Sequence, residues 1–99
     1  MAAAIETELD TALRDLSELL EAIGEPGFAS SMATLRRALL DAETREERRH
    51  IIGPGLAIFG GMNSLNDVVI MHGVSPNVEA NRRLDSLRTR VYKLLVQHL

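Results

Sequence analysis

The sequence predicts an all-α fold, a small bundle of four main helices with a kinked third helix and an irregular or short helical segment before the last one. Large apolar residues recur every three or four positions in the first, second and last parts of the chain, which is the period of a helix that buries one face. No segment alternates apolar and polar residues over several positions, as a half-buried strand does.

The first two helices are predicted within residues 2–23 and 28–42. Gly24 stands where a helix stop is expected, and Pro26-Gly27 strengthens the break between the two. The apolar stripe of the first helix is Ile5, Leu9, Leu13, Leu16, Leu20 and Ile23, and that of the second is Phe28, Met32, Leu35 and Leu39.

The third helix is expected to begin after Thr44, because Thr44 and Glu47 have the spacing of a capping box. Pro54 lies between two glycines, so we expect a kink or a break there, followed by a short helical piece over residues 56–59. Ser75-Pro76 resembles a helix cap followed by a first-turn proline, which predicts a last helix running to near Leu99. Its apolar stripe is Leu84, Leu87, Val91, Leu94 and Leu95.

Length and composition predict a single helical domain over residues 1–99. The chain has no cysteine, which excludes disulfides, thiolate chemistry and cysteine-bound metals. Its start lacks the basic and apolar regions of a signal peptide, and no apolar run approaches the roughly 20 residues of a membrane span. We therefore expect a cytoplasmic protein, and its arginine-rich basic set is typical of a GC-rich bacterium.

The net charge of −3 is unevenly distributed. Residues 1–25 carry −6 and residues 80–99 carry +4, so we expect the first and last helices to be neighbours with facing charged rims. The alternative, a nucleic-acid contact on the last helix, is disfavoured because the chain is acidic and only 3% aromatic.

The helical period disappears between Phe59 and Ser75. Gly60-Gly61 predicts a sharp turn, and Ser64 with Asp67 predicts a helix cap. Residues 65–71 then form either a helix of about two turns or, because valine and isoleucine favour strands, an extended run over residues 68–71. The sequence leaves both open.

This part of the chain resembles a family of small uncharacterised bacterial proteins. The resemblance lies in Phe-Gly-Gly-Met-x-Ser-Leu-Asn-Asp at residues 59–67 and in Asn81-x-x-Leu84-Asp85-x-Leu87-Arg88, and it covers residues 58–95. Asn63 stands where that family has glycine. The family has no established activity, so the resemblance implies a small bacterial helical protein and no mechanism.

Polar and apolar side chains in this segment form the candidate binding site. One interpretation is structural, with Ser64 and Asp67 capping a helix, Asn63 in a left-handed turn and Asn66 tied to neighbouring backbone. The other is a small pocket or contact surface. The candidate binding residues are Met62, Asn63, Ser64, Asn66, Asp67 and His72.

No catalytic residues, metal ligands or cofactor are predicted. The three histidines lack metal-ligand spacing, and the glycines lack the pattern of a phosphate-binding or dinucleotide-binding loop. The leading hypothesis is therefore a non-enzymatic helical module that forms a homodimer and binds another bacterial protein, as an adaptor or immunity-type protein does. The alternative is a ligand-binding protein or hydrolase that uses Ser64, Asp67 and His72.

Overall fold

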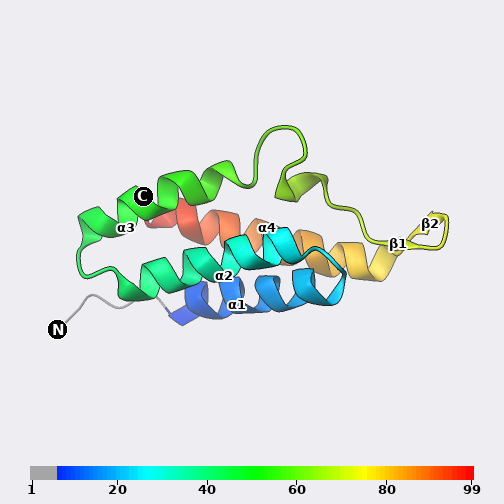
Figure 1. The fold of residues 1–99 in the computed structure, drawn as a ribbon, viewed down its shortest axis with the longest axis horizontal. Helices are drawn as coiled ribbons and strands as arrows, with labels where there is room; N and C mark the ends of the chain where they lie inside the picture. The colour runs from blue at the N-terminus through cyan, green and yellow to red at the C-terminus, as the bar shows by residue number, and fades with distance from the viewer. Residues whose placement is uncertain (1–6) are drawn as a thin grey trace.

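The computed structural model describes residues 7–99, which form four packed helices and a short hairpin. The helices are α1 (Thr7–Ala22), α2 (Pro26–Asp41), α3 (Arg45–Ala57) and α4 (Val78–Gln97). Between α3 and α4 lie one 3-10 turn, η1 (Leu65–Asp67), and the strands β1 (Met71–His72) and β2 (Ser75–Pro76). The molecule is elongated, 50 × 24 × 20 Å, with the hairpin at one end of its long axis (Figure 1).

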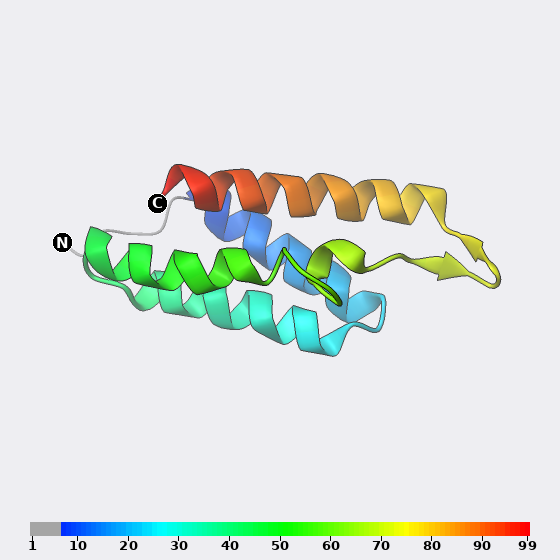
Figure 2. The ribbon, with the colours of Figure 1, turned by 90° about the horizontal axis from the view of Figure 1, so that it is seen from above.

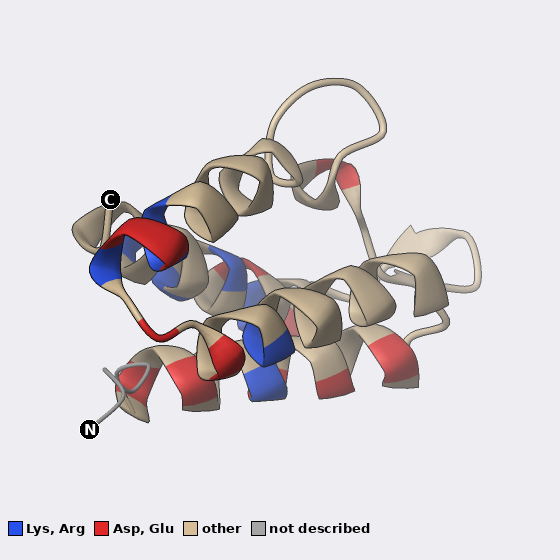
Figure 3. Ribbon diagram, turned by 60° about the vertical axis from the view of Figure 1, so that its left-hand side comes forward, with Lys and Arg blue, Asp and Glu red and all other residues tan. Residues whose placement is uncertain are grey.

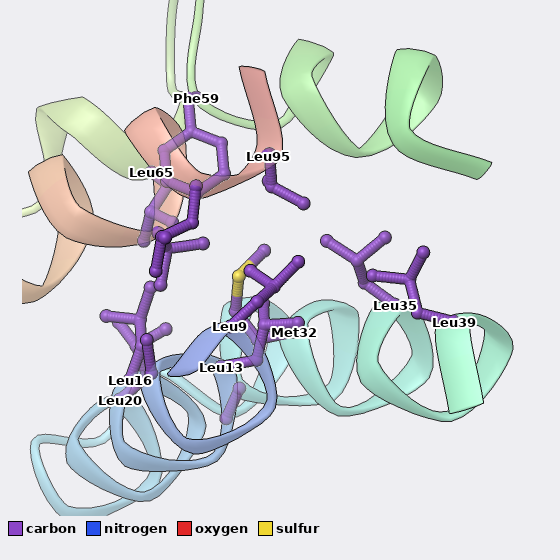
Figure 4. Close-up of a cluster of buried hydrophobic side chains, with 14 of the residues drawn as sticks. Leu9, Leu13, Leu16, Leu20, Met32, Leu35, Leu39, Phe59, Leu65 and Leu95 are labelled. Carbon is purple, nitrogen blue, oxygen red and sulfur yellow. The ribbon is translucent and has the colours of Figure 1, made fainter. Parts of the chain in front are cut away.

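The apolar stripes predicted on α1 and α2 face each other across the core. Leu9, Leu13, Leu16 and Leu20 are buried on α1, and Met32, Leu35 and Leu39 are buried on α2 (Figure 4). Ile5 lies outside the described residues. Gly24 has φ +81°, a left-handed conformation that suits glycine at the end of α1, and Pro26 is the first residue of α2.

Helix α3 is continuous across Pro54, so the predicted break and separate helical piece are wrong. The Thr44 cap is confirmed, since the Glu47 N–H donates to Thr44 Oγ1 at 3.1 Å, although Glu47 Oε2 accepts from the N–H of Glu43. Gly55 lets α3 approach α2, because a Cβ at residue 55 would lie 2.9 Å from Leu35 Cδ1. Pro54 is exposed, and the helix continues through it with one backbone donor fewer.

Replacing Pro54 with alanine is expected to leave the free energy of unfolding unchanged or to raise it by up to about 3 kcal/mol. Alanine restores the backbone N–H that helix α3 lacks at this position, and residue 54 is exposed. Thermal and urea unfolding monitored by circular dichroism measures the change. A large loss of stability would mean instead that the bundle requires the proline at this position.

Helix α4 lies beside α1 and α3 and begins two residues later than the sequence indicates (Figure 2). Asn77 is its cap, with Oδ1 accepting from the N–H of Ala80 at 3.1 Å. Ser75-Pro76 forms β2 instead, so the predicted Ser75 cap is wrong. On α4, Leu84, Val91, Leu94 and Leu95 are buried as expected, whereas Leu87 is half-buried at the edge of the core.

The charged rims of α1 and α4 meet as expected. Arg90 donates to Glu8 Oε1 at 2.6 Å, joining α4 to α1, and acidic residues recur along α1 (Figure 3). A second pair joins α2 to α1, where Arg36 Nε lies 2.6 Å from Asp10 Oδ1. That hydrogen bond raises the pKa of Arg36 above its ordinary value. Both pairs are partly exposed, so they orient the helices more than they stabilise them.

Candidate functional site

The candidate residues lie on the connection that joins α3 to α4, residues 58–77 (Figure 1). Met62 and Asn63 lie in the loop after α3, Ser64, Asn66 and Asp67 lie in or beside η1, and His72 lies in β1. The structure therefore brings three of them together at η1. It places His72 in the hairpin, at the end of the molecule.

The loop that leads into η1 reverses the chain direction through left-handed residues. Gly61 has φ +85° and Asn63 has φ 55°, which matches the expected turn and the tolerance of asparagine for this conformation. The Leu65 N–H then donates to the carbonyl oxygen of Ile58 at 3.0 Å and closes the loop. Met62, at its tip, is 92% exposed and is not a core residue.

The polar side chains of η1 hold the local backbone. Asp67 Oδ2 accepts a hydrogen bond from the Ser64 N–H at 3.1 Å, and Asn66 Nδ2 donates to the carbonyl oxygen of Phe59 at 2.5 Å. Residues 65–67 make only a single 3-10 turn, so the two-turn helix considered for residues 65–71 is not formed. The chain after it is extended and enters β1.

Arg88 fixes η1 to α4 and is one of two residues whose role the sequence analysis missed. Its side chain is buried, and its Nη1 donates to the carbonyl oxygens of Leu65 at 2.8 Å and Val68 at 3.0 Å. Its Nη2 pairs with Asp85, one turn earlier on the same helix. Its position in the sequence could have indicated this burial, because residue 88 falls on the apolar stripe of the helix between Leu84 and Val91.

Asn81 is the other residue, and it fixes the base of the hairpin. Its Oδ1 accepts from the Ile70 N–H at 2.7 Å, and its Nδ2 donates to the carbonyl oxygens of Ile70 at 2.9 Å and Asn77 at 2.8 Å. The Asn77 N–H also donates to the carbonyl oxygen of Ile70, at 2.8 Å. The side-chain amide of Asn81 therefore bridges the backbone of Ile70, just before β1, and that of Asn77, just after β2.

The hairpin held in this way is exposed and apolar. Its two strands pair in antiparallel register, Met71 opposite Pro76 and His72 opposite Ser75. The two-residue turn begins at Gly73, whose φ of +66° is the conformation that a type II′ turn requires at its first central position. The exposed apolar side chains on and beside the hairpin are those of Met71 and Val74 within it, Val69 before β1 and Val78 at the start of α4, which together we call the hairpin surface.

The hairpin surface lies in a segment without formal charge. Residues 68–78 contain no aspartate, glutamate, lysine or arginine, although a quarter of the chain is charged. Val74 is 97% exposed and Val78 is 67% exposed. Several exposed apolar side chains within one short uncharged segment of a small protein mark a contact surface more often than a single exposed apolar residue does.

Two other chemical features of the described residues bear on function. Residues 7–99 contain no group of three or more histidine, aspartate or glutamate side chains placed to hold a metal ion. Within the same range, no helix has the length and hydropathy of a membrane span. Two of the basic residues of α4 bond within the chain, the buried Arg88 with backbone carbonyls and the exposed Arg90 with Glu8.

Comparison with known proteins gives one match. A family model described as a domain of unknown function (DUF6966) matches residues 21–76, more than half of the chain. The match includes α2, α3, the η1 connection and the hairpin, and it ends before Asn81 and Arg88. Neither the curated proteins nor the solved structures contain a match to the chain.

Proposed function

This chain belongs to the family of the domain of unknown function DUF6966, and we propose that it is a non-enzymatic interaction module that pairs with a second copy of itself. The hairpin surface, formed by Val69, Met71, Val74 and Val78, is the contact. The carrying observation is that these four exposed apolar side chains lie on or directly beside a hairpin whose base is fixed to α4 by Asn81.

Fixing the hairpin in advance favours binding. Ordering a flexible loop on association costs about 0.5–1.5 kcal/mol for each immobilised side chain, and a loop that is already ordered avoids part of that cost. Arg88 and Asn81 together hold the backbone of Leu65, Val68 and Ile70. The apolar side chains that follow are thus presented in a defined geometry.

A second copy of the chain is the partner that the charge distribution favours. Like charges that meet across an interface oppose association, and the hairpin surface carries no charged side chain. A small helical bundle also buries a modest core, so apolar burial between copies adds appreciably to it. The absence of formal charge suits a neutral apolar partner, and an identical hairpin surface is one.

Light scattering coupled to size-exclusion chromatography over a range of concentrations tests the proposal. The unmodified protein is expected to form a dimer, and Met71→Lys is expected to raise the dissociation constant by about 100-fold or more, because a charge is then buried in an apolar contact. Leu40→Lys is the matched control, since Leu40 is similarly exposed but lies on α2.

The oligomeric states of the unmodified protein and of the two variants decide whether the proposal holds. A dimer that Met71→Lys dissociates and Leu40→Lys leaves intact supports the proposal. A strict monomer at every concentration, or a dimer that Leu40→Lys disrupts and Met71→Lys does not, overturns it. In the monomer case, a protein other than this chain is left as the candidate occupant of the hairpin surface.

A further inference from the structure

We propose that two copies of the chain associate by pairing the free edges of β1 and of the extended residues 69 and 70 that lead into it, antiparallel, with Val69 of one copy opposite Met71 of the other. The inference rests on the proposed function and adds the contact geometry. The result is a four-stranded sheet formed from two hairpins across a two-fold axis near Ile70. Backbone hydrogen bonds and two side chains of the hairpin surface, Val69 and Met71, then act at the same contact.

The first argument is the direction of the backbone groups in β1. The Asn77 N–H donates to the carbonyl oxygen of Ile70, and β2 pairs with β1 in the register His72 opposite Ser75. Polar groups of an extended chain alternate between its two edges, so those of Ile70 and His72 point towards β2. Those of Val69 and Met71 therefore point to the opposite edge.

That opposite edge is open in the described part of the chain. Within residues 7–99, the N–H and C=O of Val69 have no hydrogen-bond partner. The side chains of Val69 and Met71 are 58% and 52% exposed. β1 lies on the side of the hairpin away from α4, beyond the ends of α1 and α2 (Figure 2). An added strand would meet free donors and acceptors two residues apart, which is the spacing of antiparallel pairing.

The second argument is that only one edge of the hairpin can accept a strand. On β2 the outward position opposite Met71 is occupied by Pro76, which has no N–H to donate. Proline on an edge strand is a common means of preventing strand addition. Growth through β1 alone is isologous and stops at two copies, whereas two open edges would extend into a fibre.

The third argument is that the β1 edge lacks the usual protection. Natural edge strands that must stay unpaired carry lysine or other charges, and residues 68–78 carry none. The proposed register places a β-branched side chain opposite a methionine on the outer face, and it does so twice because of the two-fold symmetry. Cross-strand apolar pairs of this kind stabilise a sheet.

Mixed cysteine cross-linking tests the register. The chain has no cysteine, so any disulfide comes from the introduced residues. The variants Val69→Cys and Met71→Cys are prepared separately, mixed and oxidised. The directly opposed Cα atoms of a hydrogen-bonded antiparallel pair are about 5.5 Å apart, within disulfide range. We expect a dimer containing one copy of each variant, identified by its mass, and no comparable cross-linking of either variant alone.

Hydrogen exchange supplies a readout that does not depend on a mutation. The amides of Val69 and Met71 are expected to exchange at least about 10-fold more slowly in the concentrated dimer than in the diluted monomer. The amide of Ile70, already bonded to Asn81, should change little. Val74→Cys mixed with Met71→Cys is the matched negative control, because residue 74 lies in the turn outside the proposed ladder.

The outcomes separate this inference from the proposed function. Cross-linking of the Val69→Cys and Met71→Cys pair together with protection of both amides supports edge pairing. A dimer that depends on Met71 but shows neither result keeps the proposed function and overturns the β1 pairing. Cross-linking of Met71→Cys with itself overturns the register. A strict monomer overturns both proposals.

Discussion

Replacing Leu16 with alanine is expected to lower the free energy of unfolding by about 2–5 kcal/mol. Leu16 is fully buried in the middle of α1 and belongs to the cluster of buried side chains that α2 and η1 also supply (Figure 4). Truncation removes its transfer free energy and leaves a cavity that a packed interior closes only in part. Urea unfolding followed by circular dichroism gives the change.

Leu87→Ala is the control for Leu16→Ala. The sequence places both leucines on apolar stripes, but Leu87 is half-buried at the edge of the core. Its loss should be smaller, about 1–2 kcal/mol, because solvent already reaches part of the side chain and fills the space that truncation leaves. Equal losses for the two variants would contradict the burial that distinguishes them.

Replacing Arg88 with methionine is expected to lower the free energy of unfolding by about 2–4 kcal/mol and to loosen η1 selectively. Methionine keeps most of the apolar length of the side chain but leaves the carbonyl oxygen of Val68 without its donor. The carbonyl oxygen of Leu65 keeps only the backbone N–H of Val68, at 3.3 Å. An unsatisfied buried polar group costs about 1–3 kcal/mol. Asp85 also loses its ion pair, at a smaller cost because its side chain is 65% exposed.

The measurement for Arg88→Met combines urea unfolding with residue-resolved hydrogen exchange. The amides of residues 65–70 should exchange faster than in the unmodified protein, while those in the middle of α1 and α2 change only by the global loss. Arg90→Met is the matched control, since Arg90 lies on the same helix with its side chain 54% exposed and pairs with Glu8. Its loss should be about 1 kcal/mol or less. Equal effects of the two substitutions would refute the role assigned to Arg88.

The four helices were predictable because local signals agreed with one another. The leucines of α1 repeat at helical spacing, Gly24 adopts the left-handed conformation expected at a helix end, and Thr44 caps α3. Each of these depends on residues within one or two turns of each other, and such short-range chemistry is visible in a sequence. The facing of α1 and α4 followed from their opposite charges and is seen in the Arg90 to Glu8 pair.

The connection was harder because its conformation depends on distant residues. Ser75-Pro76 has the local chemistry of a helix start, yet it pairs with residues 71 and 72, and Asn77 takes the capping role. The reason is the hairpin, whose turn at Gly73 brings β2 against β1. Residues 65–71 divide between one 3-10 turn and an extended run, so the extended alternative describes residues 68–71 and the two-turn helix is not formed.

The candidate site shows the same division. The positive φ of Asn63, the bond from Asn66 to the Phe59 carbonyl and the bond from the Ser64 N–H to Asp67 are local. They match the structural interpretation, which the sequence left open beside the binding one. Whether the candidate residues also bind a partner stays a prediction. The hairpin surface was not foreseen, because its exposure depends on where the ends of α1 and α2 leave the hairpin uncovered (Figure 2).

By itself the sequence determined the helical class, the stripes that form the core, the end of α1 and the start of α3, since periodicity and capping act within a few residues. Only the tertiary structure decided which distant side chains hold the connection. Arg88 bonds to the backbone of Leu65 and Val68, 23 and 20 residues earlier, and Asn81 bonds to the backbone of Ile70, 11 residues earlier. A buried carbonyl must find a donor wherever the fold supplies one. The packing of distant elements determines which side chain supplies that donor, and no local sequence pattern specifies it.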